Sequence, residues 1–236
     1  MSHLLYDTVK KMNHELTEDM LSQFSAYEKL LVEWNEKMNL TAITDEYGVA
    51  TKHFLDCMAI FDHVDFKEGA SVIDVGCGAG FPSAVMAIER PDLHITMLDS
   101  LNKRLNFLNC VIEELPLPNC TTLHARAEEF ANKKEYREKY DFAVSRAVAS
   151  LASLCELCMG YVKVGGYFVA LKGPSVTEEL KMAENAISKL GGKLEGVINY
   201  SIPTTDLCHN LVVIKKVKPM EKRYPRKSPK PIKEPL

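Results

Sequence analysis

Apolar residues near the N-terminus recur at the spacing of a helix. From residue 20 to residue 38 they follow one another at steps of three or four, which predicts a helix with one apolar face. The residues of this face are Met20, Phe24, Tyr27, Leu31, Trp34 and Met38. Thr17 precedes the first of them as a candidate N-cap. With a second helix expected over about residues 47–62, residues 1–65 are predicted to form a helical region packed on the core.

From residue 71 the pattern changes to short apolar runs that alternate with helical stretches. The runs cover residues 71–75, 94–98, 120–124, 140–145 and 166–171. Alternation of this kind predicts a parallel sheet covered by helices on both faces. Two later runs, Lys193–Tyr200 and Asn210–Val217, are expected to pair antiparallel at one edge. The predicted fold class is α/β: a doubly wound, Rossmann-like sheet over residues 66–217, mostly parallel with an antiparallel edge strand.

A glycine-rich loop separates the first of these runs from the helical pattern after it. Asp74 is followed by glycines at positions 76, 78 and 80 and then by Phe81. Such glycines let the backbone approach a ligand closely, and the helix that follows offers unpaired amides. The spacing is G-x-G-x-G, whereas the dinucleotide fingerprint is G-x-G-x-x-G. With its acidic residue two places before the first glycine, the loop resembles motif I of the class I S-adenosylmethionine-dependent methyltransferases.

Polar residues follow the other strands, at the positions where an open parallel sheet binds its ligand. Asp99 comes at the end of the second strand, 19 residues after Gly80. A carboxylate there can accept the ribose hydroxyls of either kind of cofactor. Arg126, Arg146 and Lys172 follow the third, fourth and fifth strands. Three cations are therefore expected at one rim, although for any one of them a surface salt bridge is the more frequent explanation.

Composition points to one water-soluble enzyme. The chain has 236 residues, of which 46% are apolar, and this is ample for a core. Because no segment reaches about 18 uninterrupted apolar residues and the N-terminus lacks the order of a secretory leader, we expect no membrane association. Seven scattered cysteines, an odd number, fit a reducing compartment. The protein is therefore expected in the cytoplasm, and nothing in the sequence requires more than a monomer.

Charge is distributed unevenly. The net charge is −3, but the segment from Lys215 to Leu236 carries nine Lys or Arg against two Glu, which leaves −10 on the first 214 residues. Five prolines in the same segment oppose a helix, so residues 218–236 are predicted to form a basic, proline-rich, extended strap. Such a strap can bind an anionic partner. A disordered, solubilising terminus explains the charge equally well.

These features together resemble the glucose-inhibited division protein B family, methyltransferases that modify a guanine of 16S ribosomal RNA at N7. The matching motifs extend over nearly the whole chain and include Trp34-Asn35, Asn39-Leu40-Thr41-Ala42-Ile43, His53 with Asp56, the glycine loop with Phe81-Pro82, Leu98-Asp99-Ser100, Arg126-Ala127-Glu128, Ser145-Arg146, Lys172-Gly173 and Arg223-Tyr224-Pro225-Arg226-Lys227. The resemblance implies a class I methyltransferase fold, S-adenosylmethionine as cofactor, and 16S ribosomal RNA or the small ribosomal subunit as partner. Two positions, Ser83 and Ser228-Pro229, depart from the family pattern without removing a charged group.

The resemblance implies cofactor contacts at Gly76, Phe81, Ala127, Glu128 and Arg146. Together with the loop and strand-end residues, the predicted cofactor set is Asp74, Gly76, Gly78, Gly80, Phe81, Asp99, Ser100, Ala127, Glu128 and Arg146. Because guanine N7 has a lone pair that is unprotonated at neutral pH, no general base is required and alignment dominates catalysis. No metal is expected. The candidates for positioning the substrate are Asn39, His53, Arg146 and Lys172, but a structural pair explains His53 with Asp56 equally well, and a helix cap explains Asn39.

RNA access adds a second set of candidates. In A-form RNA the N7 edge lies in a deep, narrow groove, so the target guanine must be unpaired or distorted and its phosphates need anchoring. The predicted RNA-binding residues are Arg126, Lys172, Arg223, Tyr224, Arg226 and Lys227, with Tyr224 as a stacking surface. Deleting residues 219–236 is then expected to weaken RNA binding in a salt-dependent way and to spare cofactor affinity. Equal loss of both would mean that the strap is structural.

Two other functions remain open at this stage. A class I methyltransferase acting on a small molecule or a protein would share the glycine loop and the strand ends. A non-catalytic RNA-binding module would share the basic tail. A nucleotide-dependent dehydrogenase is disfavoured by the glycine spacing.

Overall fold

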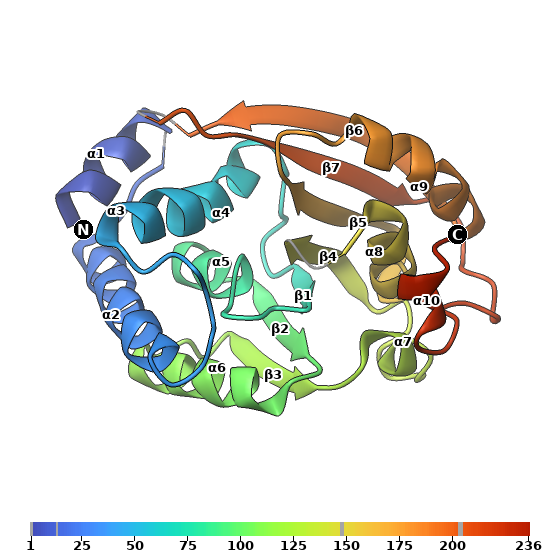
Figure 1. Cartoon of the computed structure of the whole chain (residues 1–236), viewed down its shortest axis with the longest axis horizontal. Coiled ribbons are helices and arrows are strands. Elements are labelled where there is room, and N and C mark those ends of the chain that lie inside the picture. The colour runs from blue at the N-terminus through green and yellow to red at the C-terminus, as the bar shows by residue number, and fades with distance from the viewer. Residues whose placement is uncertain (1, 13, 147–148, 203–204) are drawn as a thin grey trace.

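The computed structural model describes residues 2–12, 14–146, 149–202 and 205–236. Helices occupy one end of the molecule and the C-terminal tail the other, with the sheet between them (Figure 1). The helices of the N-terminal region are α1 (Ser2–Lys11), α2 (Glu18–Asn35), α3 (Glu46–Gly48), the π-helical η1 (Val49–Leu55), α4 (Asp56–Met58) and the 3-10 helix η2 (Ala59–Asp62). None of the helices in the described ranges is both long enough and apolar enough to span a membrane.

Helix α2 forms where the apolar spacing predicts it. Thr17 is its N-cap, and its side chain accepts a hydrogen bond from the backbone N–H of Met20. Phe24, Tyr27 and Leu31 are fully buried on the predicted face. The second predicted helix is also present, as the continuous helical stretch from α3 to η2, although its middle winds as a π-helix.

The strands of the described residues form one seven-stranded sheet in the order β3-β2-β1-β4-β5-β7-β6. Their bounds are β1 (Ser71–Val75), β2 (His94–Asp99), β3 (Cys120–His124), β4 (Tyr140–Arg146), β5 (Val162–Lys172), β6 (Gly192–Ser201) and β7 (Cys208–Lys216). Strands β1 to β5 pair in parallel, and β7 pairs antiparallel with both β5 and β6. The predicted α/β fold class is confirmed. The strand of opposite direction, β7, lies second from the edge, with β6 outside it.

Both faces of the sheet are buried, which explains the nearly continuous apolar runs. Val72 contributes to the core on one face and Ile73 to the core on the other. Helices cover these faces: α5 (Ser83–Glu89), α6 (Asn102–Glu114), α7 (Ala127–Phe130), α8 (Leu151–Cys158) and α9 (Thr177–Lys189). Helix α2 packs against α5 and α6, and Tyr27 stacks on Phe107 with ring centroids 6.4 Å apart.

The strap, residues 218–236, is packed onto the protein. Met220, Tyr224 and Pro231 are buried, so the interpretation as a disordered terminus is wrong. The prediction that the prolines of the extended strap oppose a helix is wrong for Lys230–Lys233, which forms the short helix α10. Pro231 lies in the first turn of α10, where a helix needs no backbone N–H donor.

His14, between α1 and α2, joins the N-terminal region to α5. Its Nδ1 contacts Glu89 and its Nε2 lies 2.9 Å from Asp62 Oδ1. The hydrogen bond with Glu89 raises the pKa of His14 from 6.5 to about 9. A folded-state pKa above the unfolded value means that the contact stabilises fully below pH 6.5 and is lost as the pH rises through about 9.

We therefore expect His14→Gln to lower the free energy of unfolding by about 1–3 kcal/mol at pH 6 and by much less at pH 9.5. Urea unfolding of both proteins at the two pH values measures this. The exposed His94, replaced in the same way, is the control for loss of an imidazole from the surface and should leave the free energy of unfolding nearly unchanged. The same loss for His14→Gln at both pH values would contradict the assignment.

Candidate functional site

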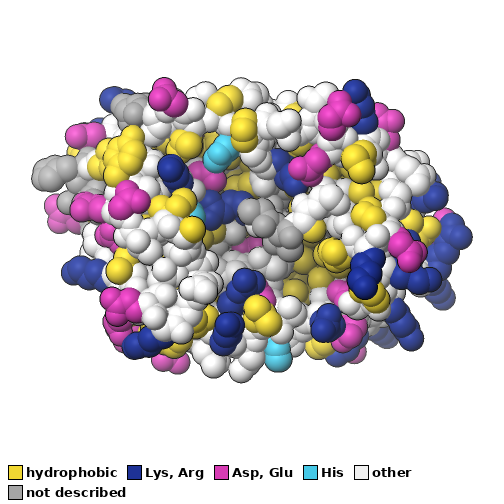
Figure 2. Space-filling model, viewed as in Figure 1, with side chains coloured by type: hydrophobic (Ala, Val, Ile, Leu, Met, Phe, Trp, Pro, Cys, Tyr) yellow, Lys and Arg dark blue, Asp and Glu magenta, His cyan; other side chains and the backbone are white. Residues whose placement is uncertain are grey.

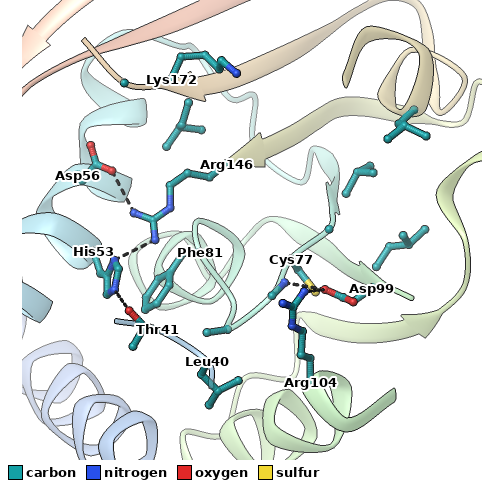
Figure 3. A pocket seen from close by; sticks show the side chains of 18 of the residues that line it. Leu40, Thr41, His53, Asp56, Cys77, Phe81, Asp99, Arg104, Arg146 and Lys172 are labelled. Atoms are coloured by element: carbon teal, nitrogen blue, oxygen red, sulfur yellow. Dashed lines mark hydrogen bonds and ion pairs between the residues drawn. The ribbon is translucent and has the colours of Figure 1, made fainter. Parts of the chain in front are cut away.

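A cavity of about 1030 Å³ opens at the carboxyl ends of β1, β2, β4 and β5. Its wall is made by the glycine loop, the start of α7, the end of β5 and the helical stretch around His53 (Figure 3). The start of β7 closes the side next to β5, because Lys172 pairs with Asn210. Segments far apart in the sequence therefore meet at the place expected for ligand binding in an open parallel sheet.

The glycine loop presents its backbone to the cavity. Gly76 and Gly78 line the cavity, and both have positive φ angles. The backbone N–H of Gly76 donates to Leu98 O at 2.8 Å, and that of Gly78 to Asp99 Oδ2 at 3.0 Å. These bonds fix the loop against the end of β2, so that little adjustment is needed when a ligand binds.

Asp74 and Gly80, at the two ends of the loop, do not line the cavity. Asp74 is fully buried and accepts a hydrogen bond from the N–H of Ser83 at 3.3 Å. Burial raises the pKa of Asp74 to about 7. These two predicted cofactor residues therefore support the loop and do not face the cavity.

Asp99 lies at the cavity wall with only 2% of its surface exposed. Its Oδ1 accepts from the N–H of Leu101 at 2.9 Å, and its Oδ2 accepts from Gly78 and from Arg104 Nη1 at 3.3 Å. A carboxylate has about four acceptor positions, so one position remains for a ligand hydroxyl. Figure 3 shows Arg104 beside this carboxylate at the cavity edge.

Arg146 is the centre of a polar cluster at the other side of the cavity. Its Nη1 donates to Asp56 Oδ2 at 3.1 Å and to Lys52 O at 3.0 Å. Its Nη2 lies 3.0 Å from His53 Nδ1. The guanidinium also lies over the Phe81 ring, 4.8 Å from its centroid. The side chain is therefore held in one orientation before any ligand arrives.

His53 is neutral in this cluster. Burial, together with the charge of Arg146, lowers the pKa of His53 to about 4. Nδ1 lies near both Arg146 Nη2 and Lys52 O, at 3.0 and 3.1 Å; because a guanidinium can only donate, we assign the ring proton to Nε2, which then donates to Thr41 Oγ1 at 2.8 Å. The ring also stacks on Phe81 with centroids 4.3 Å apart. His53 and Asp56 are therefore joined through Arg146.

Asp56 connects Arg146 to the end of the sheet. Its Oδ1 accepts from Tyr200 Oη at 2.7 Å and from His209 Nδ1 at 2.6 Å. Burial opposes ionisation of Asp56, but the hydrogen bond from His209 and the charge of Arg146 hold its pKa below the ordinary value. The same hydrogen bond raises the pKa of His209. The result is a buried carboxylate shared by three donors.

The remaining rim residues lie at the start of α7 and at the end of β5. Arg126, Ala127 and Glu128 line the cavity where β3 leads into α7. Lys172 also lines the cavity, but its Nζ contacts Glu179 Oε2 at 2.7 Å and donates to Ala149 O at 3.1 Å. Lys172 is therefore paired with the N-terminal part of α9.

The glycine loop, the carboxylate after β2 and the walled cavity can be compared with known proteins. Residues 20–208 match the family model GidB, described as rRNA small subunit methyltransferase G. The ribosomal RNA small subunit methyltransferase G of Clostridium perfringens (strain SM101) is 52% identical over 235 residues, 98% of each chain. That of Clostridium botulinum (strain Loch Maree) is 50% identical over 99% of this chain and 98% of its own. The chain belongs to this family.

Solved structures outside the GidB family share its fold. TYW2 of M. jannaschii, solved in complex with AdoMet, has a TM-score of 0.55 at 15% identity and covers 75% of this chain and 80% of its own. TrmN of Thermus thermophilus has a TM-score of 0.53 at 17% identity over 71% of this chain and 53% of its own. The predicted class I methyltransferase fold and the resemblance to the GidB family are confirmed.

Most of the residues predicted for the GidB site line the cavity. They are Gly76, Gly78, Phe81, Asp99, Ser100, Arg126, Ala127, Glu128, Arg146, Lys172 and His53. Asn39 is exposed and lies outside the lining, whereas its neighbours Leu40 and Thr41 are part of it. The C-cap of α2 is Glu36 and not Asn39, and the loop that holds Asn39 is fixed by Asn35, whose Oδ1 accepts from the N–H groups of Leu40 and Thr41 at 2.8 and 3.0 Å.

Two of the predicted RNA-binding residues of the strap are corrected. Tyr224 is only 5% exposed and cannot offer a stacking face to a base. Arg226 makes a bidentate ion pair with the fully buried Glu156 of α8, through Nε at 2.9 Å and Nη2 at 2.6 Å. Its charge is needed there because a buried carboxylate without a partner is costly. Arg223 and Lys227 are exposed.

The sequence analysis missed Tyr200 and His209. They lie one residue inside the end of β6 and the start of β7, and pairing of the two strands places them opposite each other. The register of β7 against β5 then brings His209 to the cavity beside Lys172. The available signal was the polar pair His209-Asn210 immediately before an apolar run, at the start of a strand that runs opposite to its neighbours.

Proposed function

We propose that this protein transfers a methyl group from S-adenosylmethionine to N7 of a guanine in 16S ribosomal RNA. The observation that supports it best is one continuous cavity that joins the glycine loop to the Arg146 cluster at the carboxyl ends of the strands. The methyl donor and the guanine nucleophile have to meet in one enclosed space for the methyl group to pass directly between them. Membership of the GidB family supports the choice of ribosomal RNA.

The residues of the cavity fit the proposed cofactor. Leu98, Ala127 and Leu157 give the wall apolar surface suited to adenine. Asp99 keeps an acceptor position for a ribose hydroxyl, and the backbone of Gly76 and Gly78 allows close approach. The positive charge of Arg146 suits the carboxylate of the amino-acid part. When bound, S-adenosylmethionine would supply an electrophilic methyl group on a sulfonium.

Methylation at N7 needs no residue to remove a proton. His53, with a pKa of about 4, is neutral, and its Nδ1 lone pair is already engaged by Arg146. The cluster is thus suited to hold the shape of the cavity wall rather than to act as a base. Rigid side chains around Phe81 would align the guanine with the methyl group, and alignment of this kind can supply most of the catalysis.

The surroundings of the cavity suit an RNA chain. Arg126, Arg104 and Lys52 lie on its lining, and dark-blue Lys and Arg side chains gather over the C-terminal tail (Figure 2). The exposed Arg223 and Lys227 belong to that tail. These cations would bind phosphates while the target base, splayed from its stack, enters the cavity. We propose a monomer in the cytoplasm, acting on 16S ribosomal RNA or the small ribosomal subunit.

The test is to map 7-methylguanine in 16S ribosomal RNA from cells with and without this gene. We expect one modified guanine to disappear on deletion and to return with the wild-type gene. Gly76→Asp should not restore it, because a side chain at a φ of +77° strains the backbone of the loop that lines the cavity. An unchanged methylation map would reject the proposal, and methylation of a free metabolite or a protein would favour the other enzyme class. Restoration by Gly76→Asp would favour a non-catalytic RNA-binding module.

A further inference from the structure

The strap packs against α7, the helix that brings Ala127 and Glu128 to the cavity. Gly160 shows how close the approach is. A Cβ added there would lie 2.9 Å from Ala131 Cβ, 3.0 Å from Met220 Cε and 3.5 Å from Pro225 Cδ. Only a residue without a side chain leaves room for the strap and the end of α7 at the same place.

Two polar side chains bond both the C-terminal end of α7 and the strap, Asn132 with one bond to the strap and Arg137 with several. Asn132 Nδ2 donates to Glu128 O at 3.0 Å and to Pro225 O at 3.3 Å. Arg137 Nη1 donates to Ala131 O at 3.4 Å and to Tyr224 O at 2.9 Å. Its Nη2 donates to Met220 O at 2.9 Å. The carbonyl of the cavity residue Glu128 is thus linked to the strap by one amide group.

The strap itself is fixed on its other side. Arg226 pairs with the buried Glu156, and its backbone N–H also donates to Glu156 Oε1 at 2.7 Å. The N–H of Met220 donates to Glu138 Oε1 at 2.7 Å. These anchors connect the strap to α8 and to the loop before β4, so it can serve as a rigid support.

Helix α7 needs such a support. It has four residues, and a helix of this length is unstable without tertiary contacts. On the core side, Tyr161 Oη donates to Ala127 O at 2.7 Å. On the outer side, Asn132, Arg137 and the buried Tyr224 supply the contacts.

We propose that the strap positions α7 for cofactor binding, with Asn132 as the positioning residue that joins them. The inference depends on the proposed binding of S-adenosylmethionine in the cavity. It assigns two faces to the strap: an inner face that shapes the cofactor wall and an outer face whose cations meet RNA. Deleting residues 219–236 is then expected to lower cofactor affinity and RNA affinity together, contrary to the expectation from the sequence.

The test compares Asn132→Ala with Asn119→Ala. Asn119 is a matched control, because its Nδ2 also bridges two backbone carbonyls, Ala87 O and Arg90 O at 3.4 Å each, and it is not part of the cavity lining. We expect Asn132→Ala to raise the Kd and the KM for S-adenosylmethionine about 5- to 10-fold. The KM for ribosomal RNA and the kcat at saturating cofactor should stay unchanged. Asn119→Ala should change none of them.

A second variant separates the two faces of the strap. Replacing the exposed Arg223 and Lys227 by alanine should weaken RNA binding, more at low salt than at high salt, and leave the calorimetric Kd for S-adenosylmethionine unchanged. An unchanged cofactor Kd in Asn132→Ala would overturn the inference, as would an equal rise in Asn119→Ala. Failure of the wild-type protein to bind S-adenosylmethionine would overturn the proposed function as well.

Discussion

Replacing Asp56 by alanine is expected to abolish methyl transfer and to lower the free energy of unfolding by about 3–5 kcal/mol. The change removes the acceptor of Arg146, Tyr200 and His209 at once. A buried guanidinium without its carboxylate is an uncompensated charge, and the hydroxyl of Tyr200 loses its acceptor. Urea unfolding and incorporation of labelled methyl groups into ribosomal RNA measure the two effects.

The matched control for this variant is Asp92→Ala. Asp92 also pairs with an arginine, Arg90 at 2.7 Å, but the two side chains are 29% and 32% exposed. Water replaces the contact there, so we expect a loss of no more than about 1 kcal/mol and normal activity. Equal losses for the two aspartates would mean that burial of the Arg146 cluster adds nothing to its strength.

The second large effect is expected at Gly80, where alanine should cost about 2–4 kcal/mol and weaken cofactor binding. Its φ is +92°, and an added Cβ would lie 2.7 Å from Tyr27 Oη and 2.8 Å from Leu108 Cδ2. Neither neighbour can easily move, because Tyr27 donates to Ala79 O and both side chains are fully buried. Relief of the clash would therefore shift the glycine loop itself.

A comparison with Gly165 separates backbone strain from steric clash as causes of this loss. It has the same φ of +92°, but nothing lies within 4 Å of an added Cβ. Gly165→Ala should therefore cost only the backbone strain, about 1–2 kcal/mol, and leave the Kd for S-adenosylmethionine unchanged. Urea unfolding gives the stabilities and calorimetry the affinities. If the two substitutions cost the same, packing under the loop is not the reason for glycine at position 80.

The strands and the glycine loop could be predicted because each depends on neighbouring residues. A strand buried on both faces must be apolar along its length, and the turn after β1 must contain glycine wherever the backbone approaches a ligand. The rim residues Asp99, Arg146 and Lys172 were found for a related reason. In a parallel sheet the position just after each strand lies at the same edge, so chain order is enough to locate them.

The strap shows what a local pattern leaves open. Its charge and its prolines are properties of composition, and they predicted cations available to RNA. Whether a side chain faces solvent depends on the surface beneath it, and here Glu156 of α8 takes Arg226 while the core takes Tyr224. Arg223 and Lys227 lie in the same short segment but are exposed to solvent, so they can still contact RNA.

The amino-acid sequence by itself determined the α/β class, the strand ends and the glycine loop, since these follow from periodicity and from the backbone freedom of single residues. Only the tertiary structure decided that Arg146 and His209 share the carboxylate of Asp56, and that Asn132 bonds the strap. These contacts join residues 90 to 153 positions apart, and they depend on strand order and register. Register follows from the packing of the whole sheet, which no single stretch of the chain specifies.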